Sequence, residues 1–162
     1  MAGTVTSDRS VSVLNLSNKG LDRLPNDKKI NYAAVKELRI SGNRLVRLDS
    51  LNNFKNLQQI DASHNQLARL TSFVAVKLKL KTLDVSNNKI SGTEGLQNLG
   101  ALQSLNLSYN NIETWPRLDT LRNLKELNLS GNALTVLPNV ACLPSLISIS
   151  LDNNYIETLD QA

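Results

Sequence analysis

Apolar residues recur along this chain in the pattern L-x-x-L-x-L-x-x-N-x-L, where L stands for any apolar residue and x for any residue. Seven copies of the pattern begin at residues 11, 35, 57, 80, 102, 124 and 146, and every apolar place in all of them holds an apolar residue. With 41% hydrophobic residues, this agreement has a chance probability on the order of 10⁻¹¹. A period of this length indicates a solenoid in which each copy forms one structural unit.

Two kinds of element are expected in each copy. The L-x-L centre alternates apolar and polar residues, which predicts a short strand whose apolar side chains point inward. Between copies the apolar residues recur at every third place, as in Leu48-Leu51-Phe54-Leu57, and this spacing matches a 3₁₀ helix. We therefore expect an α/β repeat solenoid with a concave parallel β-sheet and a convex side of short 3₁₀ or helical turns.

An asparagine occupies the same place in six of the copies. These residues are Asn43, Asn65, Asn88, Asn110, Asn132 and Asn154. A side-chain amide both donates and accepts hydrogen bonds, so we expect the asparagines to bind backbone groups in a structural ladder. Lys19 takes this place in the first copy, and such a departure from the pattern is expected in an N-terminal capping repeat. From Lys19 to Asn154, successive residues at this place are separated by 24, 22, 23, 22, 22 and 22 residues in the sequence.

These residues and spacings resemble the 22-residue class of leucine-rich repeats, typified by the nuclear regulatory subunit of protein phosphatase 1. The class also includes flagellar dynein light chains, the A′ protein of the U2 splicing particle and several centrosomal or basal-body scaffolds. The resemblance covers residues 11 to 162. It implies a right-handed superhelix, a role in protein binding, and the cytoskeleton, centrosome or basal body as a location.

The chain is expected to contain an N-terminal extension over residues 1–10 and one leucine-rich repeat domain over residues 11–162. One extra residue in the segment 76–81 predicts a small bulge. The seventh copy is interpreted as incomplete, because no repeat with a polar outer face follows it. An open edge there would expose Ile156 and Leu159 and could support self-association, and the chain is interpreted as part of a longer protein.

Charge is unevenly distributed. The net charge is +4, but residues 1–81 hold 14 Lys or Arg against 6 Asp or Glu, whereas residues 82–162 hold 4 against 8. The basic half could attract an acidic partner, or the difference could be drift among solvated residues. Nucleic acid is a less favoured partner, because the six aromatic residues are too scattered to form a base-stacking surface.

Catalytic and metal-binding motifs are missing from the sequence. The single histidine, His64, has no nucleophile or metal ligand at a recognisable spacing, and the loop around Gly92 and Gly95 lacks the lysine of a phosphate-binding loop. We expect no enzyme activity, no cofactor and no small-molecule substrate. One cysteine, Cys142, cannot form an intramolecular disulfide and is expected to be buried, as is Trp115 in a column of leucines. No apolar run is long enough for a transmembrane segment, so a cytoplasmic location is expected.

Residues between the inward leucines of each strand point outward, so they line the concave face. The candidate partner-binding residues are those that depart from a background of serine and asparagine in copies two to five, with Tyr109 as the expected anchor, together with their neighbours in the same columns. They are Glu37, Arg39, Gln59, Asp61, His64, Asp84, Asn106, Tyr109, Glu126 and Asn128.

A non-catalytic protein-interaction domain, serving as a scaffold or targeting module, is the function that the sequence favours. Two alternatives stay open. The resemblance also allows a regulatory subunit of a protein phosphatase, although those relatives present a concave face richer in aromatic and acidic residues. A splicing-particle or nucleic-acid-associated module is the second alternative, favoured slightly by the basic half and opposed by the acidic half.

Overall fold

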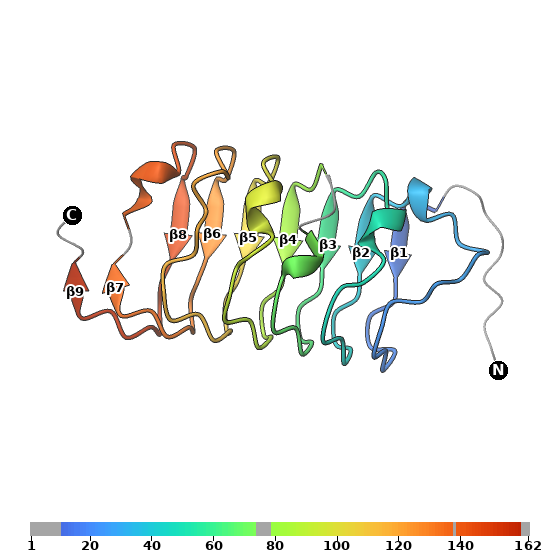
Figure 1. Ribbon diagram of the computed structural model, residues 1–162, viewed down its shortest axis with the longest axis horizontal. Helices are drawn as coiled ribbons and strands as arrows, with labels where there is room; N and C mark the ends of the chain where they lie inside the picture. Colours follow the sequence, from blue (N-terminus) through green and yellow to red (C-terminus); the bar gives the residue numbers. More distant parts are fainter. Residues whose placement is uncertain (1–10, 74–78, 138, 160–162) are drawn as a thin grey trace.

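The computed structural model describes residues 11–73, 79–137 and 139–159. A row of three-residue parallel strands forms the main sheet, which runs along the molecule in chain order (Figure 1). Its strands are β1 (Val13–Asn15), β2 (Glu37–Arg39), β3 (Gln59–Asp61), β4 (Thr82–Asp84), β5 (Ser104–Asn106), β6 (Glu126–Asn128) and β8 (Ser148–Ser150). Each strand lies at the L-x-L centre of one copy, so the predicted repeat solenoid is confirmed.

Neighbouring strands pair in register, and equivalent positions of successive copies therefore stand side by side. Leu38 of β2 pairs with Leu14 of β1 on one side and with Ile60 of β3 on the other. Leu38 and Ile60 point inward and are buried, whereas Arg39 is exposed. Because a strand has a period of two, every central leucine enters the core and its neighbours on either side face outward.

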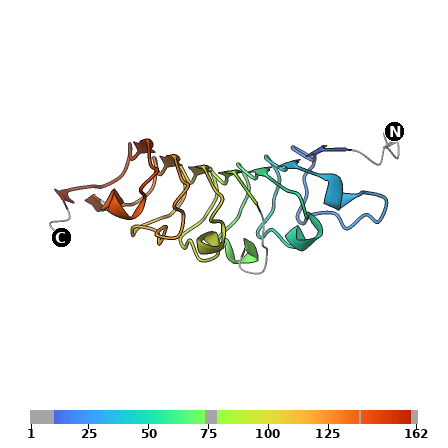
Figure 2. The same cartoon turned by 90° about the horizontal axis from the view of Figure 1, so that it is seen from above.

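Short 3₁₀ helices lie on the side opposite the sheet, which is the convex side of the molecule (Figure 2). They are η1 (Tyr32–Ala34), η2 (Leu51–Asn53), η3 (Thr71–Phe73), η4 (Leu96–Asn98) and η5 (Val140–Cys142). Copy five has turns at this place, in which Leu121 N donates to Leu118 O at 2.8 Å and Leu124 N to Leu121 O at 3.0 Å. The predicted spacing of three is confirmed, because Leu51 and Phe54 are both buried.

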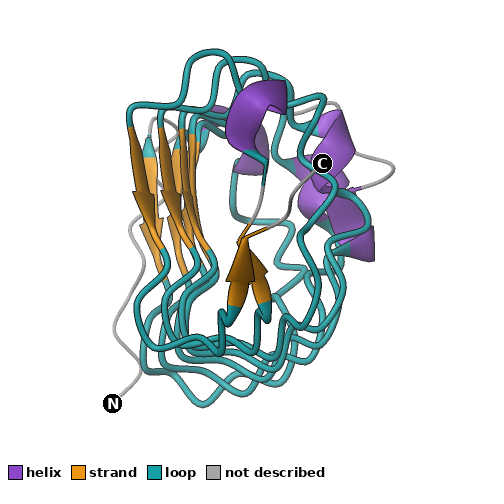
Figure 3. Cartoon of the chain, turned by 90° about the vertical axis from the view of Figure 1, so that its left-hand side faces the viewer, coloured by secondary structure: helices purple, strands orange, loops and turns teal. Residues whose placement is uncertain are grey.

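A second, two-stranded sheet was not predicted from the sequence. It pairs β7 (Val136–Leu137) with β9 (Thr158–Leu159) in parallel. Figure 3, which looks along the solenoid, shows this pair across the interior from the main sheet. The two strands fall at equivalent places in copies six and seven, so the repeat register holds on this side of the solenoid as well.

The asparagine ladder is present as predicted. The Asn88 side-chain amide donates to Ala62 O (3.1 Å) of the preceding copy and to Val85 O (3.0 Å) of its own. Its carbonyl oxygen accepts from Leu67 N at 2.9 Å. Each rung therefore joins two copies at the point where the chain turns inward, and the ladder begins with Asn43, which accepts from Lys19 N at 3.0 Å.

Copy seven is less buried than the copies before it. Its template residues Leu146, Ile149, Leu151 and Ile156 are only partly buried, whereas the corresponding residues of copy four have no exposed surface. Strand β8 lies at the end of the sheet among the described residues. Of the segment expected to bulge, residues 76–78 lie outside the described residues.

Cys142 corrects one expectation, because it is exposed rather than buried. It occupies the last place of η5, which corresponds to Asn53 in η2 and Asn98 in η4. Those asparagines are exposed too. In these turns the buried residues recur at every third place, and the asparagines lie between two of them. Burial was expected from the residue type alone, whereas the place of Cys142 in the turn leaves it exposed.

Candidate functional site

The outward residues of the main sheet form two columns on the concave face. One column contains Glu37 and Gln59, which pair directly, and continues to Glu126. The other contains Arg39, Asp61 and further residues of the same repeat place. Arg39 Nε contacts Glu37 Oε1 of its own strand at 2.5 Å, and both side chains keep contact with solvent. The sheet thus brings together eight of the ten candidate residues: Glu37, Arg39, Gln59, Asp61, Asp84, Asn106, Glu126 and Asn128.

Residues of the second column also stabilise the strand ends. Asp61 Oδ1 accepts hydrogen bonds from Ser63 N (3.1 Å) and Ser63 Oγ (2.7 Å). Asp84 makes the same two bonds with Ser86 at 2.9 and 2.7 Å, and its second oxygen accepts from Asn106 Nδ2 at 3.1 Å. Such side-chain to backbone bonds fix turns. These carboxylates therefore have a structural role in addition to the surface that they present, and the repeat pattern did not predict this role.

A shallow hollow of about 280 Å³ lies on the concave face between copies five and seven. Small side chains such as Ser104, Ser148 and Ser150 leave space around Glu126. Glu126 Oε2 accepts a hydrogen bond from Ser104 Oγ at 3.1 Å. The hollow reaches beyond copies two to five, where most of the candidate residues were expected, but the candidates Asn106, Glu126 and Asn128 line it.

His64 and Tyr109 do not lie on the strands. They belong to a column in the turns that follow the strands, and every member of this column has a positive φ. The members are Asn18 (56°), Gly42 (66°), His64 (52°), Asn87 (54°), Tyr109 (54°), Gly131 (68°) and Asn153 (55°). Asparagine and glycine tolerate this left-handed conformation, whereas other residues lose roughly 1–2 kcal/mol in it. The predominance of asparagine and glycine in the column was the sequence signal that could have revealed it.

Tyr109 is held against the next copy. A Cβ atom built on Gly131 would lie 2.5 Å from Cδ1 of the Tyr109 ring, so the ring occupies the space that a side chain at Gly131 would need. The tyrosine is nevertheless 55% exposed. It therefore presents an aromatic surface at the edge of the concave sheet beside copy six.

Trp115 packs against the core but remains half-buried. The leucines that precede it in its column, Leu24, Leu48 and Leu70, are buried. The expectation that Trp115 is a core residue therefore holds only in part, because one side of the ring borders hollows on the side opposite the sheet.

In the described part of the chain, no group of three His, Cys, Asp or Glu residues is placed to hold a metal ion. Over the same residues, no helix has the length and apolar character that crossing a membrane requires.

Comparisons with known proteins agree with this architecture. The chain is similar to TLR13 in the crystal structure of the TLR13–ssRNA13 complex, with a TM-score of 0.80 and 27% identity, over 92% of this chain and 22% of that chain. It is also similar to an internalin, InlF of Listeria monocytogenes, with a TM-score of 0.62 and 26% identity, over 86% of this chain and 39% of that one. The chain thus spans less than half the length of either protein. Curated proteins give no sequence match.

The family described as "Leucine Rich repeats (2 copies)" matches residues 79–120 and residues 122–161. The two matches adjoin and cover β4 to β9, where the spacing of the asparagines is most regular. Because they make up just over half of the sequence, the chain belongs to the leucine-rich repeat family.

Proposed function

We propose that this protein is a non-catalytic interaction module that binds a protein partner on its concave face. Leucine-rich repeat proteins are generally non-catalytic interaction modules, and the parallel sheet presents a regular surface for this purpose. The proposed contact residues are the ten candidates, with eight on the sheet and with His64 and Tyr109 along its edge.

The conformation of Tyr109 is the observation that carries this proposal. The residue is exposed in a left-handed conformation where most copies have glycine or asparagine, so neither burial nor backbone preference explains a tyrosine there. Backbone strain of this kind concentrates at ligand-binding sites. Tyrosine is also enriched among the residues that dominate binding energy. Tyr109 would anchor the partner, while Arg39 and Glu126 supply charges that orient it.

The finer parts of the proposal rest on the sequence. The repeat spacing supports a domain over residues 11–162 after a short extension and favours the 22-residue class. The resemblance to that class supports a scaffold or targeting role in the cytoplasm, with the cytoskeleton, centrosome or basal body as the location. A phosphatase-regulatory role is the first alternative. Nucleic-acid binding is the second, and it gains support from the similarity to a protein solved in complex with ssRNA13. Self-association through copy seven is a further proposal.

Affinity capture with quantitative mass spectrometry tests the proposal. Tyr109→Asn removes the ring but keeps a residue suited to the left-handed conformation, so it should weaken partner binding by about 1–3 kcal/mol without loss of stability. Arg39→Glu should mainly slow association and change its salt dependence. Arg122→Glu is the control, because Arg122 is exposed and precedes β6 on the convex side of the copy.

Normal binding by both concave variants, together with loss of binding by Arg122→Glu, would show that the partner uses another face. The classes of protein recovered distinguish a scaffold, a phosphatase subunit and a splicing component. Recovery that depends on RNA, and that nuclease treatment abolishes, would favour the nucleic-acid alternative.

A further inference from the structure

A column of arginines lies on the side of the solenoid away from the sheet. Arg23, Arg47 and Arg69 occupy the same place in copies one, two and three, and each directly precedes an inward leucine of the core. Backbone hydrogen bonds join the copies two to three residues before these arginines, since Arg44 N donates to Leu21 O (2.8 Å) and Gln66 N to Leu45 O (2.9 Å). The three exposed side chains therefore start from adjacent backbone segments, roughly 5 Å apart from copy to copy.

Few carboxylates pair with this column, although Asp22 precedes Arg23 in the chain and Glu94 lines a hollow together with Arg69. Arg47 pairs with Asp49 at 2.7 Å, but both side chains are more than half exposed and such a pair is weak. Among the described residues, no other ion pair involves the three arginines. Like charges placed side by side repel one another. An acidic ligand would remove this repulsion.

The arginine column ends at a trough. The first hollow, of about 500 Å³, is lined by Arg69 and Thr71 of copy three and by Ser91 and Gly92 of copy four. It shares Ser91, Gly92 and Glu94 with a second hollow of about 610 Å³ between copies four and five. Copy four opens this space because it has Gly92 and Thr93 where the three preceding copies have arginine and leucine.

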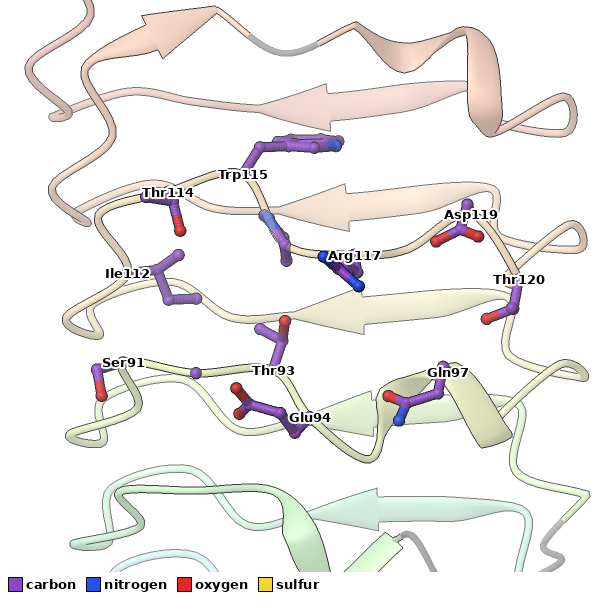
Figure 4. A pocket seen from close by; sticks show the side chains of 12 residues that line it. Ser91, Thr93, Glu94, Gln97, Ile112, Thr114, Trp115, Arg117, Asp119 and Thr120 are labelled. Carbon is purple, nitrogen blue, oxygen red and sulfur yellow. The ribbon is translucent and has the colours of Figure 1, made fainter.

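Trp115 lies where the second hollow meets a third. The third hollow, of about 240 Å³, shares Thr114 and Trp115 with the second and extends to β7. Figure 4 shows the middle of the trough, with Thr93 and Glu94 on the segment of copy four and Trp115 and Arg117 on that of copy five. The trough therefore crosses the repeats along the solenoid and passes from arginines to an aromatic ring.

We propose that the arginine column and this trough, together called the back groove, bind an extended acidic protein segment. Its acidic residues lie over Arg23, Arg47 and Arg69, and an apolar residue beyond them packs beside Trp115. A peptide fits this surface better than a nucleic acid, because Glu94 and Asp119 line the trough and would repel a phosphate backbone. A peptide can change from acidic to neutral residues along its length. The back groove is separate from the concave face.

Trp115 is the chain's one tryptophan, so intrinsic fluorescence reports on the groove. The probes are a glutamate-rich peptide that ends in leucines, the same peptide with glutamine for every glutamate, and a single-stranded RNA oligonucleotide. The glutamate peptide should change the emission of Trp115 with a saturating dependence on concentration, and added salt should weaken this binding. The glutamine peptide should bind at least about tenfold more weakly.

Variants locate the binding. The triple variant Arg23→Glu, Arg47→Glu, Arg69→Glu should lower affinity for the glutamate peptide by at least about tenfold. The matched control Lys36→Glu, Lys55→Glu, Lys81→Glu makes the same change of charge at exposed lysines near the starts of the strands, and should lower it by less than about threefold. Glutamine replacements of the three arginines serve if the glutamate variant does not fold, as judged by circular dichroism.

Three results would overturn the proposal: no binding of the glutamate peptide, equal loss of affinity in the lysine control, or binding of RNA alone that depends on the arginines. Tyr109→Asn should leave binding of the glutamate peptide unchanged. Failure of the back groove would therefore leave the proposed function of the concave face intact, and the reverse also holds.

Discussion

The left-handed turn position links residue choice to binding in this protein. Every copy needs a positive φ one residue before the ladder position, because the chain there leaves the strand and turns toward the core. Its N–H still pairs with the next copy, as when Tyr109 N donates to Ser130 O at 2.8 Å. The backbone is therefore fixed, and only the side chain is free to vary. His64 and Tyr109 use this freedom at the expense of backbone strain.

Replacement of Gly131 with alanine tests how tightly Tyr109 is held. A Cβ atom at Gly131 meets both the positive φ and the Tyr109 ring, so Gly131→Ala should destabilise the protein by roughly 1–2 kcal/mol and displace the ring. Gly100→Ala is the control, since nothing lies within 4 Å of a Cβ at Gly100. Urea denaturation measures both, and equal midpoints would show that Tyr109 does not rest on Gly131.

The exposure of Cys142 gives a second prediction for a single residue. Its thiol should react with a disulfide reagent in the folded protein at a rate within about tenfold of that in urea, because the residue is exposed and its Sγ makes only a long hydrogen bond to Asn139 O at 3.8 Å. The absorbance of the released thiolate measures both rates. A native rate lower by several orders of magnitude would mean that Cys142 is buried.

The elements of this fold are held by asparagines rather than by long strands. Each strand of the main sheet has only three residues, and the ladder extends the contact between copies into the turns. A second set of asparagines does the same before the strands, where Asn56 Nδ2 donates to Ala33 O and Asn123 Nδ2 to Gly100 O, both at 2.8 Å. The buried side-chain polar atoms of the described residues all have partners.

Burial should decide how much each rung of the ladder contributes to stability. Asn88→Leu leaves Leu67 N and the carbonyls of the same turn without partners away from water, at a cost of roughly 1–3 kcal/mol. Asn154 makes equivalent bonds but is only half-buried, so water can replace its amide and Asn154→Leu should cost less. Lys89→Ala, at an exposed neighbour, should cost less than about 0.5 kcal/mol. Urea midpoints that do not follow this order would contradict the structural role of the ladder.

The repeat pattern predicts the strands, their register, the 3₁₀ turns and the ladder, because those features depend on residues that recur in every copy. The sheet-facing candidates follow from the same register. Features of single copies were not predicted. They arise where a copy departs from the pattern, and the neighbouring copy decides what such a departure does. Gly92 and Thr93, for example, line a trough together with Arg69 and Trp115 of the neighbouring copies. Asp61 and Asp84 were likewise not recognised as partners of the serines two residues on.

At the scale of the whole molecule, the two faces differ in chemistry. The concave sheet carries side chains of both charges, and some of its carboxylate oxygens also stabilise the turns through hydrogen bonds. The exposed ring of Tyr109 lies at its edge. The back groove carries arginines at one end and a tryptophan in its middle. Since the two surfaces lie on opposite sides of a thin solenoid, binding of one partner need not exclude binding of the other. This arrangement suits a scaffold that joins two proteins.

Copy seven gives a prediction about assembly. Ile147 is 80% exposed and occupies the place held by Lys36, Lys81 and Lys125 in earlier copies, and Tyr155 is 68% exposed. Strand β8 has a neighbour on one side only among the described residues, and exposed strand edges favour pairing with another chain. We therefore expect the protein to associate through copy seven as its concentration rises, with the mean mass from light scattering rising above that of a monomer.

Ile147→Lys tests whether this edge is responsible, because it introduces the lysine that copies two, four and six carry at this place. It should shift the onset of association to at least about tenfold higher concentration, since burying an unpaired lysine in such an interface is unfavourable. Val46→Lys is the matched control, as Val46 is 55% exposed but lies in copy two, far from β8. Equal effects of the two substitutions would assign the association to general surface hydrophobicity. A monomer at every concentration, with hydrogen-exchange protection in β8 equal to that in β4, would show that copy seven needs no partner.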